Sequence, residues 1–149
     1  MNPVTIAERR LIAADQGTVW QRIADFGSEH RWSSALAACH RDTQSVAVGT
    51  VRHCTLSRPL LGRRAVSEEL TEFVAPQALG YRLRGGAGPF RTAAGRWVLR
   101  PSGGCTVVEV FGTFQPHNML VALLFGRLAR AAARRAARQA LHDLADSLT

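Results

Sequence analysis

Two charged side chains, Arg52 and Glu69, are the strongest candidates for chemistry in this sequence. They lie in two strand-like segments, 50–57 and 64–74, that a turn rich in Pro and Gly separates. An antiparallel hairpin about the centre of that turn places Arg52 opposite Glu69 on the apolar face of the sheet. Because charges on such a face are costly unless paired, the two are either a structural ion pair or a guanidinium and a carboxylate that serve a ligand.

Aromatic residues accompany this pair. The same hairpin geometry, carried along the next strands, puts Tyr81 and Trp97 on the apolar face, as core side chains or as walls of a cavity. Phe26, Trp32 and His117 lie at segment ends, where they either line the opening of such a cavity or pack in loops. The candidates for a catalytic role are Arg52, Glu69 and Tyr81.

The hairpins also predict a polar outer face. They set Arg96 opposite Glu109 and Glu68 opposite Arg84, so that charged partners meet across strands on the side exposed to water. A slip of one residue in any hairpin would mix the two faces, and the agreement between hairpins therefore supports the register. The outer face is expected to hold Glu68, Glu72, Arg82, Arg84, Arg96, Arg100 and Glu109.

A long helix must close this sheet, and segment 118–148 predicts one of about 25–30 residues because it is dominated by Ala, Leu and Arg. Its apolar stripe runs through Ala133, Ala137 and Leu141 at helical spacing. Arg130 falls within the stripe and either extends out along its stem or places a guanidinium in the interior. Residues 119–125 are apolar all round and too few for the roughly 20 that a membrane span needs, which favours a covered helix end or a contact surface, including one for a homodimer.

The segments before the sheet predict a strand and two short helices. Segment 4–14 reads as a first strand, Asp15 is placed to cap a helix, and Ser28 is placed to cap a second one that carries Leu36. Residues 46–48 are expected to form a brief strand. The whole chain therefore predicts one α+β domain, residues 1–149, with a curled antiparallel sheet of six to seven strands around the C-terminal helix.

The composition of the chain narrows the classes of partner and the cellular compartment to be expected. The 149 residues carry a net charge of +8 from 19 arginines and no lysine, the bias of a high-GC bacterial genome. These arginines are scattered and few aromatics lie among them, so nucleic acid is not expected as a partner. No apolar leader segment precedes the first strand, and Cys39, Cys54 and Cys105 are odd in number without CxxC spacing. We therefore expect free thiols in the cytoplasm.

The motifs of several enzyme classes are missing from the sequence. It has no GxSxG, no HExxH and no HxH, and Cys39-His40 alone is a weak metal signal. The glycine-rich run 85–89 lies between two strands, where it is a turn and not a phosphate cradle before a helix. Neither a cofactor nor a metal is expected.

Short motifs recur in a familiar order: Val19-Trp20, Asp25-Phe26, Trp32, Val48-Gly49-Thr50-Val51-Arg52, Glu69-Leu70, Gly80-Tyr81, Trp97, Cys105-Thr106 and Phe114-Gln115-Pro116. With the element order, they make essentially the whole chain resemble the START/SRPBCC superfamily, the helix-grip fold. Its polyketide cyclase/dehydrase and lipid-transport branch looks closest. The resemblance implies a hydrophobic ligand held in a cavity between the sheet and the terminal helix. The expected ligand-binding residues are Phe26, Trp32, Arg52, Glu69, Tyr81, Trp97 and Arg130.

Three kinds of function follow. The first is a binding or carrier protein for a small hydrophobic ligand, polyketide- or lipid-like. The second is an aromatase/cyclase or dehydratase, in which Arg52 would polarise an enolate oxygen of a poly-β-ketone while Glu69 or Tyr81 moves protons. The third is an interaction module that uses the arginine face and residues 119–125. Pairing with Arg52 would keep Glu69 a weakly basic carboxylate, which favours binding over catalysis.

Overall fold

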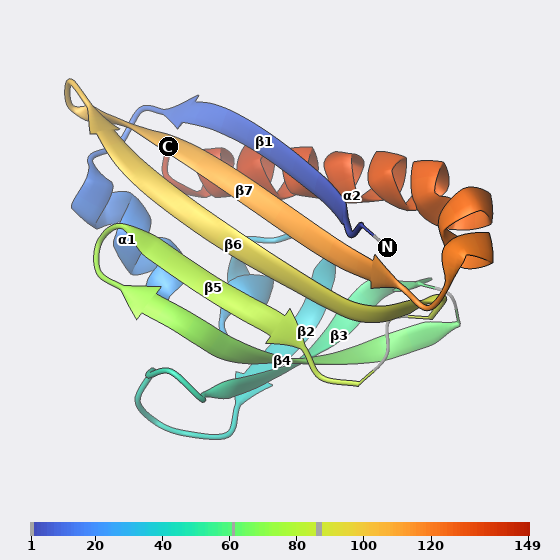
Figure 1. Cartoon of the computed structure of the whole chain (residues 1–149). Helices are drawn as coiled ribbons and strands as arrows, with labels where there is room; N and C mark the ends of the chain where they lie inside the picture. The colour runs from blue at the N-terminus through green and yellow to red at the C-terminus, as the bar shows by residue number, and fades with distance from the viewer. Residues whose placement is uncertain (1, 61, 86–87) are drawn as a thin grey trace.

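A seven-stranded antiparallel sheet curls around one long helix (Figure 1). The computed structural model of the chain describes residues 2–60, 62–85 and 88–149. The strand order is β1-β7-β6-β5-β4-β3-β2, a meander from β2 to β7 with the first strand added beside the last. This confirms the predicted α+β helix-grip architecture. The strands are β1 (Val4–Ile12), β2 (Leu36–Arg41), β3 (Val51–Leu60), β4 (Arg63–Val74), β5 (Ala78–Leu83), β6 (Phe90–Ser102) and β7 (Cys105–Pro116).

Two segments between β1 and β3 differ from the prediction. Helix α1 (Gln16–Ala24) begins as expected at Asp15, whose carboxylate accepts the Thr18 N–H at 2.8 Å. The second short helix is only a 3-10 turn, η1 (Glu29–Arg31), and the Ser28 side chain does not cap it. The strand expected at 46–48 is wrong, because the strand that pairs with β3 is β2 and it uses residues assigned to the second helix. Pairing along an open sheet edge outweighs local helix preference there.

Helix α2 (Met119–Ser147) crosses the sheet against β1 and β7. Asn118 caps it by accepting the Val121 N–H at 2.9 Å. Its fully buried residues, Ala137, Leu141 and Leu144, all lie in its second half. The close packing of helix on sheet is therefore confined to that half. Among the described residues, no helix is both long and apolar enough to cross a membrane.

Two irregularities in the pairing of β4 correct the predicted register. Arg52 faces Glu68 and Val51 faces Glu69, so the expected pairing of Arg52 with Glu69 is wrong by one residue, because the β3–β4 register shifts between Thr55 and Leu60. A second shift, between Leu70 and Glu72 in the pairing of β4 with β5, is a bulge that the assumption of regular hairpins leaves out. Before the bulge the even-numbered residues of β4 face inward, and after it the odd-numbered ones do. Glu68, assigned to the outer face, is therefore an inner residue.

In the later strands, β5 to β7, the residues predicted to face the core and those predicted to face solvent do so. Arg96 faces Phe111 and not Glu109, a shift of two residues that leaves Arg96 and Glu109 together on the outer face. Arg96 pairs there with Glu72 on β4, at 2.7 Å between Nε and Oε1. Since side chains alternate with a period of two, an even shift preserves the division between core and solvent.

Two glycines shape the middle of the inner face. Gly95 on β6 and Gly112 on β7 face each other, flanked in the same row by Tyr81 and Ile6. A Cβ added at Gly95 would lie 2.5 Å from both Cζ and Oη of Tyr81, which means that the phenol rests across the Gly95 backbone. The missing side chain therefore fixes where Tyr81 lies.

Cys39 on β2 and Cys54 on β3 face each other and form a disulfide, with their Cα atoms 4.2 Å apart. Cys105 is a free thiol. The expectation of three free cysteines is wrong, because it rested on spacing along the chain whereas β2 and β3 bring the two residues together across the sheet. The cytoplasmic location stays a prediction.

Candidate ligand site around Arg52

Arg52 lies on the inner face of β3 between two carboxylates. Its Nη1 is 2.9 Å from Glu29 Oε2, and its Nη2 is 2.9 Å from Glu68 Oε1. The Nε–H also donates to Glu68 Oε1 at 3.0 Å. The side chains of Arg52 and Glu29 are only 9% and 7% exposed, and that of Glu68 is 19% exposed. The group is a buried triad with a formal charge of −1 when both carboxylates are ionised.

Glu29 reaches this position from η1. The backbone N–H of Gly27 donates to both of its carboxylate oxygens, at 2.8 and 3.0 Å, which orients the carboxylate towards Arg52. Gly27 has φ +102°, and a Cβ there would lie 2.9 Å from Cβ of Arg41. Only glycine satisfies both the left-handed backbone and the close approach of β2. Sequence reasoning missed Glu29, since no local pattern shows which way a residue of such a turn points.

Two aromatic rings enclose the guanidinium. Its Cζ lies 4.3 Å from the ring centre of Phe26 and 4.4 Å from that of Tyr81. Faces of aromatic rings attract a cation, most strongly where water is excluded. Further along the inner face, Trp32 meets Trp97 edge-on with ring centres 6.0 Å apart. The site is thus a charged centre inside an aromatic wall.

Burial and charge act in opposite directions on the two titratable groups at the centre. Burial alone would lower the pKa of Arg52, but the charges of Glu68 and Glu29 outweigh it and raise this pKa above its ordinary value. Burial, helped by the charge of Glu68, raises the pKa of Tyr81, against the opposing effects of Arg52 and a hydrogen bond with Trp97. At neutral pH the site therefore holds a guanidinium and a protonated phenol.

Unused hydrogen-bonding capacity lies beside this wall. Among the described residues, Trp32 Nε1 and His30 Nδ1 are buried without a partner. Leaving such a group unpaired typically costs about 1–3 kcal/mol. Trp32 also lines a hollow of about 280 Å³ at the surface, between α1, the turn η1 and the end of α2. The residues that line it are Thr18, Gln21, Arg22, Asp25, Ser28, Arg31, Trp32 and Leu148.

The expected site residues divide into two groups. The structure brings together Phe26, Trp32, Arg52, Tyr81 and Trp97. Three others lie elsewhere. Glu69 points outward to Arg82 at 3.0 Å, and Arg130 and His117 are exposed. Glu69 is outside because of the bulge in β4, and Arg130 because it lies at the border of the helix stripe.

The second hollow described, about 270 Å³ in volume, lies on the outer face of the sheet. Glu72, Arg96 and Phe111 line it, together with Tyr81 and the two glycines Gly80 and Gly95. It is not the expected pocket between sheet and helix lined by Tyr81 and Trp97. Trp97 is 8% exposed and packs with Leu99 and Leu141 in the core.

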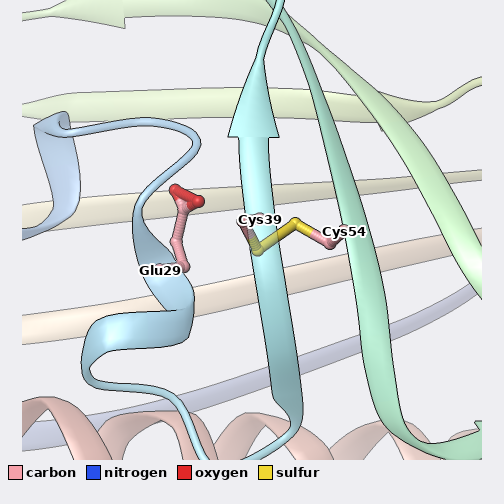
Figure 2. A group of neighbouring side chains, drawn as sticks. All are labelled: Glu29, Cys39 and Cys54. Atoms are coloured by element: carbon pink, nitrogen blue, oxygen red, sulfur yellow. A yellow bond between two sulfur atoms is a disulfide. The ribbon is translucent and has the colours of Figure 1, made fainter.

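Glu29 also lies beside the disulfide, as Figure 2 shows. Its carboxylate and the sulfurs of Cys39 and Cys54 lie within 4.8 Å of one another, a grouping that could hold a metal ion. Metals bind thiolates, and these sulfurs are joined to each other. The carboxylate is bound to the Arg52 guanidinium, whose positive charge opposes a nearby metal cation. The oxidised cluster therefore does not fit a metal.

Residues 3–149 match the family described as polyketide cyclase / dehydrase and lipid transport. The chain belongs to this family. No curated protein matches the sequence. The fold recurs in XoxI from Bacillus cereus (TM-score 0.77, 18% identity, covering 97% of this chain and 95% of that one). It recurs in a protein from Nitrosospira multiformis, with a TM-score of 0.75 and 20% identity, covering 97% of this chain and 96% of that one. It also recurs in Ara h 8.0201, with a TM-score of 0.74 and 15% identity, covering 97% of this chain and 96% of that one. At these identities the likeness shows the fold alone.

Proposed function

We propose that this protein binds a small hydrophobic ligand, polyketide- or lipid-like, with its polar end near Arg52 and its apolar part between the sheet and α2. The observation that carries the proposal is the buried triad of Arg52, Glu29 and Glu68 within the wall formed by Phe26, Tyr81, Trp32 and Trp97. Family membership supports the ligand class.

The energetics of the triad favour a role beyond stability. Taking a guanidinium and two carboxylates out of water costs several kcal/mol per ion, and apolar residues of similar volume often hold such a space equally well. A charged centre inside an aromatic wall can bind both ends of an amphipathic ligand, which an apolar core cannot. It gives the polar end of a ligand a fixed partner and leaves apolar surface for the remainder.

The surface hollow beside Trp32 supplies a route for the ligand. It lies between α1, η1 and the C-terminal end of α2. Trp32 stands between the surface hollow and Trp97, and its free N–H is a donor for a ligand oxygen. Rotation of Trp32 would join the hollow to the interior, and we propose this path for entry.

Binding is favoured over catalysis by the state of the carboxylates. Glu29 and Glu68 both bind Arg52, so neither is a free base. The alternative function, an aromatase/cyclase or dehydratase acting on a poly-β-ketone, is favoured by one observation. Tyr81 is a partly buried phenol with a raised pKa, able to donate a hydrogen bond to an enolate oxygen. Glu69 cannot act in such a reaction from the outer face.

Native mass spectrometry of the protein, purified under mild conditions, tests the proposal together with titration of an apolar fluorescent dye followed by Trp emission. We expect a retained small molecule or dye binding that saturates at one site. Trp32→Phe keeps an aromatic ring, though a smaller one, and removes the N–H. It should weaken the binding of dyes that carry a hydrogen-bond acceptor more than the binding of dyes without one. Glu69→Gln, on the outer face, is the control and should bind normally. No retained molecule together with no saturable dye would refute ligand binding.

A further inference from the structure

The first half of α2 turns its large apolar side chains away from the protein. Leu120, Leu124 and Leu128 follow one another at four-residue steps and are 62%, 60% and 69% exposed, with Leu123 beside them at 77%. Side chains at this spacing share one face of a helix. We call these four residues the leucine stripe. The residues turned towards the protein are small: Ala122, Gly126, Ala129 and Ala133 are all partly buried.

This arrangement is the reverse of what an ordinary surface helix shows, because the large apolar groups of such a helix face the core. Figure 1 shows these turns at the far right of the view, beyond the end of β7, where the sheet does not cover them. The stripe is contiguous, and exposed apolar patches of this kind mark sites of interaction.

Arginines border the stripe and no carboxylate interrupts it. Arg127 and Arg135 lie on the same side of the helix as the leucines, and residues 119–142 contain no Asp or Glu. Arg134 and Arg138 bind Glu8 on β1, at 4.0 and 3.1 Å. In the described part of the chain, Arg127 and Arg135 form no ion pair, so their guanidiniums are available to an anionic partner.

We propose that the leucine stripe docks the protein on an anionic lipid surface, with α2 lying in the plane of the membrane. A helix with an apolar face and a border of basic residues inserts its apolar side at the boundary of headgroups and acyl chains. The planar guanidiniums of Arg127 and Arg135 match the geometry of lipid phosphates. Docking goes beyond ligand binding and does not depend on it.

Charge decides between this partner and a second copy of the chain. A two-fold interface would place the same surface of two molecules together, so it would gather the arginines that border both stripes, Arg127 and Arg135 of each copy, at one interface. No carboxylate of residues 119–142 could neutralise them. An anionic membrane supplies the missing negative charge and buries the leucines at the same time.

Flotation with lipid vesicles tests the proposal. One set of vesicles mixes phosphatidylglycerol with phosphatidylcholine, and the other is phosphatidylcholine alone. We expect the protein to float with the anionic vesicles only, and salt to weaken the binding. Leu124→Gln with Leu128→Gln should reduce binding by about tenfold or more. Arg127→Gln with Arg135→Gln should weaken it and remove most of its salt dependence.

Leu11→Gln is the matched control, because Leu11 on β1 is 60% exposed, the same fraction as Leu124. It should leave flotation unchanged, and unchanged thermal unfolding would show that every variant is folded. Failure of the wild-type protein to float with anionic vesicles would overturn the proposal. So would flotation that survives the double leucine substitution. A dimer in sedimentation that the leucine substitutions dissociate, without vesicle binding, would assign the stripe to a second copy.

Discussion

Arg52 and Glu68 face each other across β3 and β4 inside the protein, whereas Glu69, the next residue, faces outward to Arg82. Two neighbouring residues of one strand therefore serve two different ion pairs, one buried and one exposed. The two Arg–Glu pairs are chemically similar and differ in burial, so the effect of burial on an ion pair can be measured within this one protein.

Arg52→Met should destabilise the fold strongly. The substitution keeps an unbranched side chain but leaves Glu29 and Glu68 buried without their cation. Removing one partner of a buried ionic group typically costs about 3–5 kcal/mol. Urea unfolding followed by Trp fluorescence measures the loss.

Arg82→Met is the matched control for this experiment. Arg82 pairs with Glu69 at 3.0 Å, but its side chain is 62% exposed. Loss of an exposed pair costs up to about 1 kcal/mol. Equal losses for Arg52→Met and Arg82→Met would show that the burial of the triad is wrong.

Gly95→Ala should destabilise the protein through Tyr81. The added Cβ would lie 2.5 Å from the phenol ring, and overpacking of this kind typically costs about 1–3 kcal/mol. The loss should shrink in a Tyr81→Leu background, because the clashing atoms are gone. Gly112→Ala is the milder comparison, since its Cβ would meet Ile6 at 3.1 Å. Additive losses from Gly95→Ala and Tyr81→Leu would argue against this contact.

The disulfide predicts how many thiols react before and after reduction. Unreduced, denatured protein should show one reactive thiol, Cys105, and reduced protein should show three. Cys39→Ser with Cys54→Ser should lower stability by about 2–4 kcal/mol, because a cross-link over 15 residues restricts the unfolded chain. Cys105→Ser is the control and should cost much less. Three reactive thiols before reduction would contradict the pairing.

The sequence was sufficient to predict the architecture because its periodic signals are strong. The long run rich in Ala, Leu and Arg predicts α2, and the turns between strands predict the meander from β3 to β7. The division of the sheet into two faces also held for β5, β6 and β7, since errors of two residues in register leave it unchanged.

The site could be predicted only in part, for two physical reasons. Register shifts between Thr55 and Leu60 and between Leu70 and Glu72 exchanged Glu69 for Glu68, and such irregularities leave no clear mark in composition. Glu29 and the pairing of Cys39 with Cys54 depend on where η1 and β2 settle against β3, which is a tertiary effect.

A last prediction concerns the attachment of α2 to the segment before β2. Asp143 accepts the backbone N–H of Ser34 at 2.8 Å, its hydroxyl at 2.7 Å and the Gln139 amide at 2.9 Å. Burial would raise the pKa of Asp143, but these hydrogen bonds outweigh it and lower the pKa below 3.8. A lowered folded-state pKa contributes stability that is present above the unfolded value and is lost as the pH falls. Asp143→Asn should therefore cost about 1 kcal/mol at pH 7 and progressively less below about pH 4.

The matched control for this variant is Asp146→Asn, on the same helix, because the Asp146 side chain is 67% exposed and pairs only with His142 at 3.2 Å in the described structure. Its cost should be smaller at pH 7, since an exposed pair contributes little. Thermal unfolding of wild type and both variants between neutral and acid pH makes the comparison. If the loss from Asp143→Asn stayed constant down to acid pH, the contribution of Asp143 would not come from its charge, and the hydrogen bonds with Ser34 would not be what lowers its pKa.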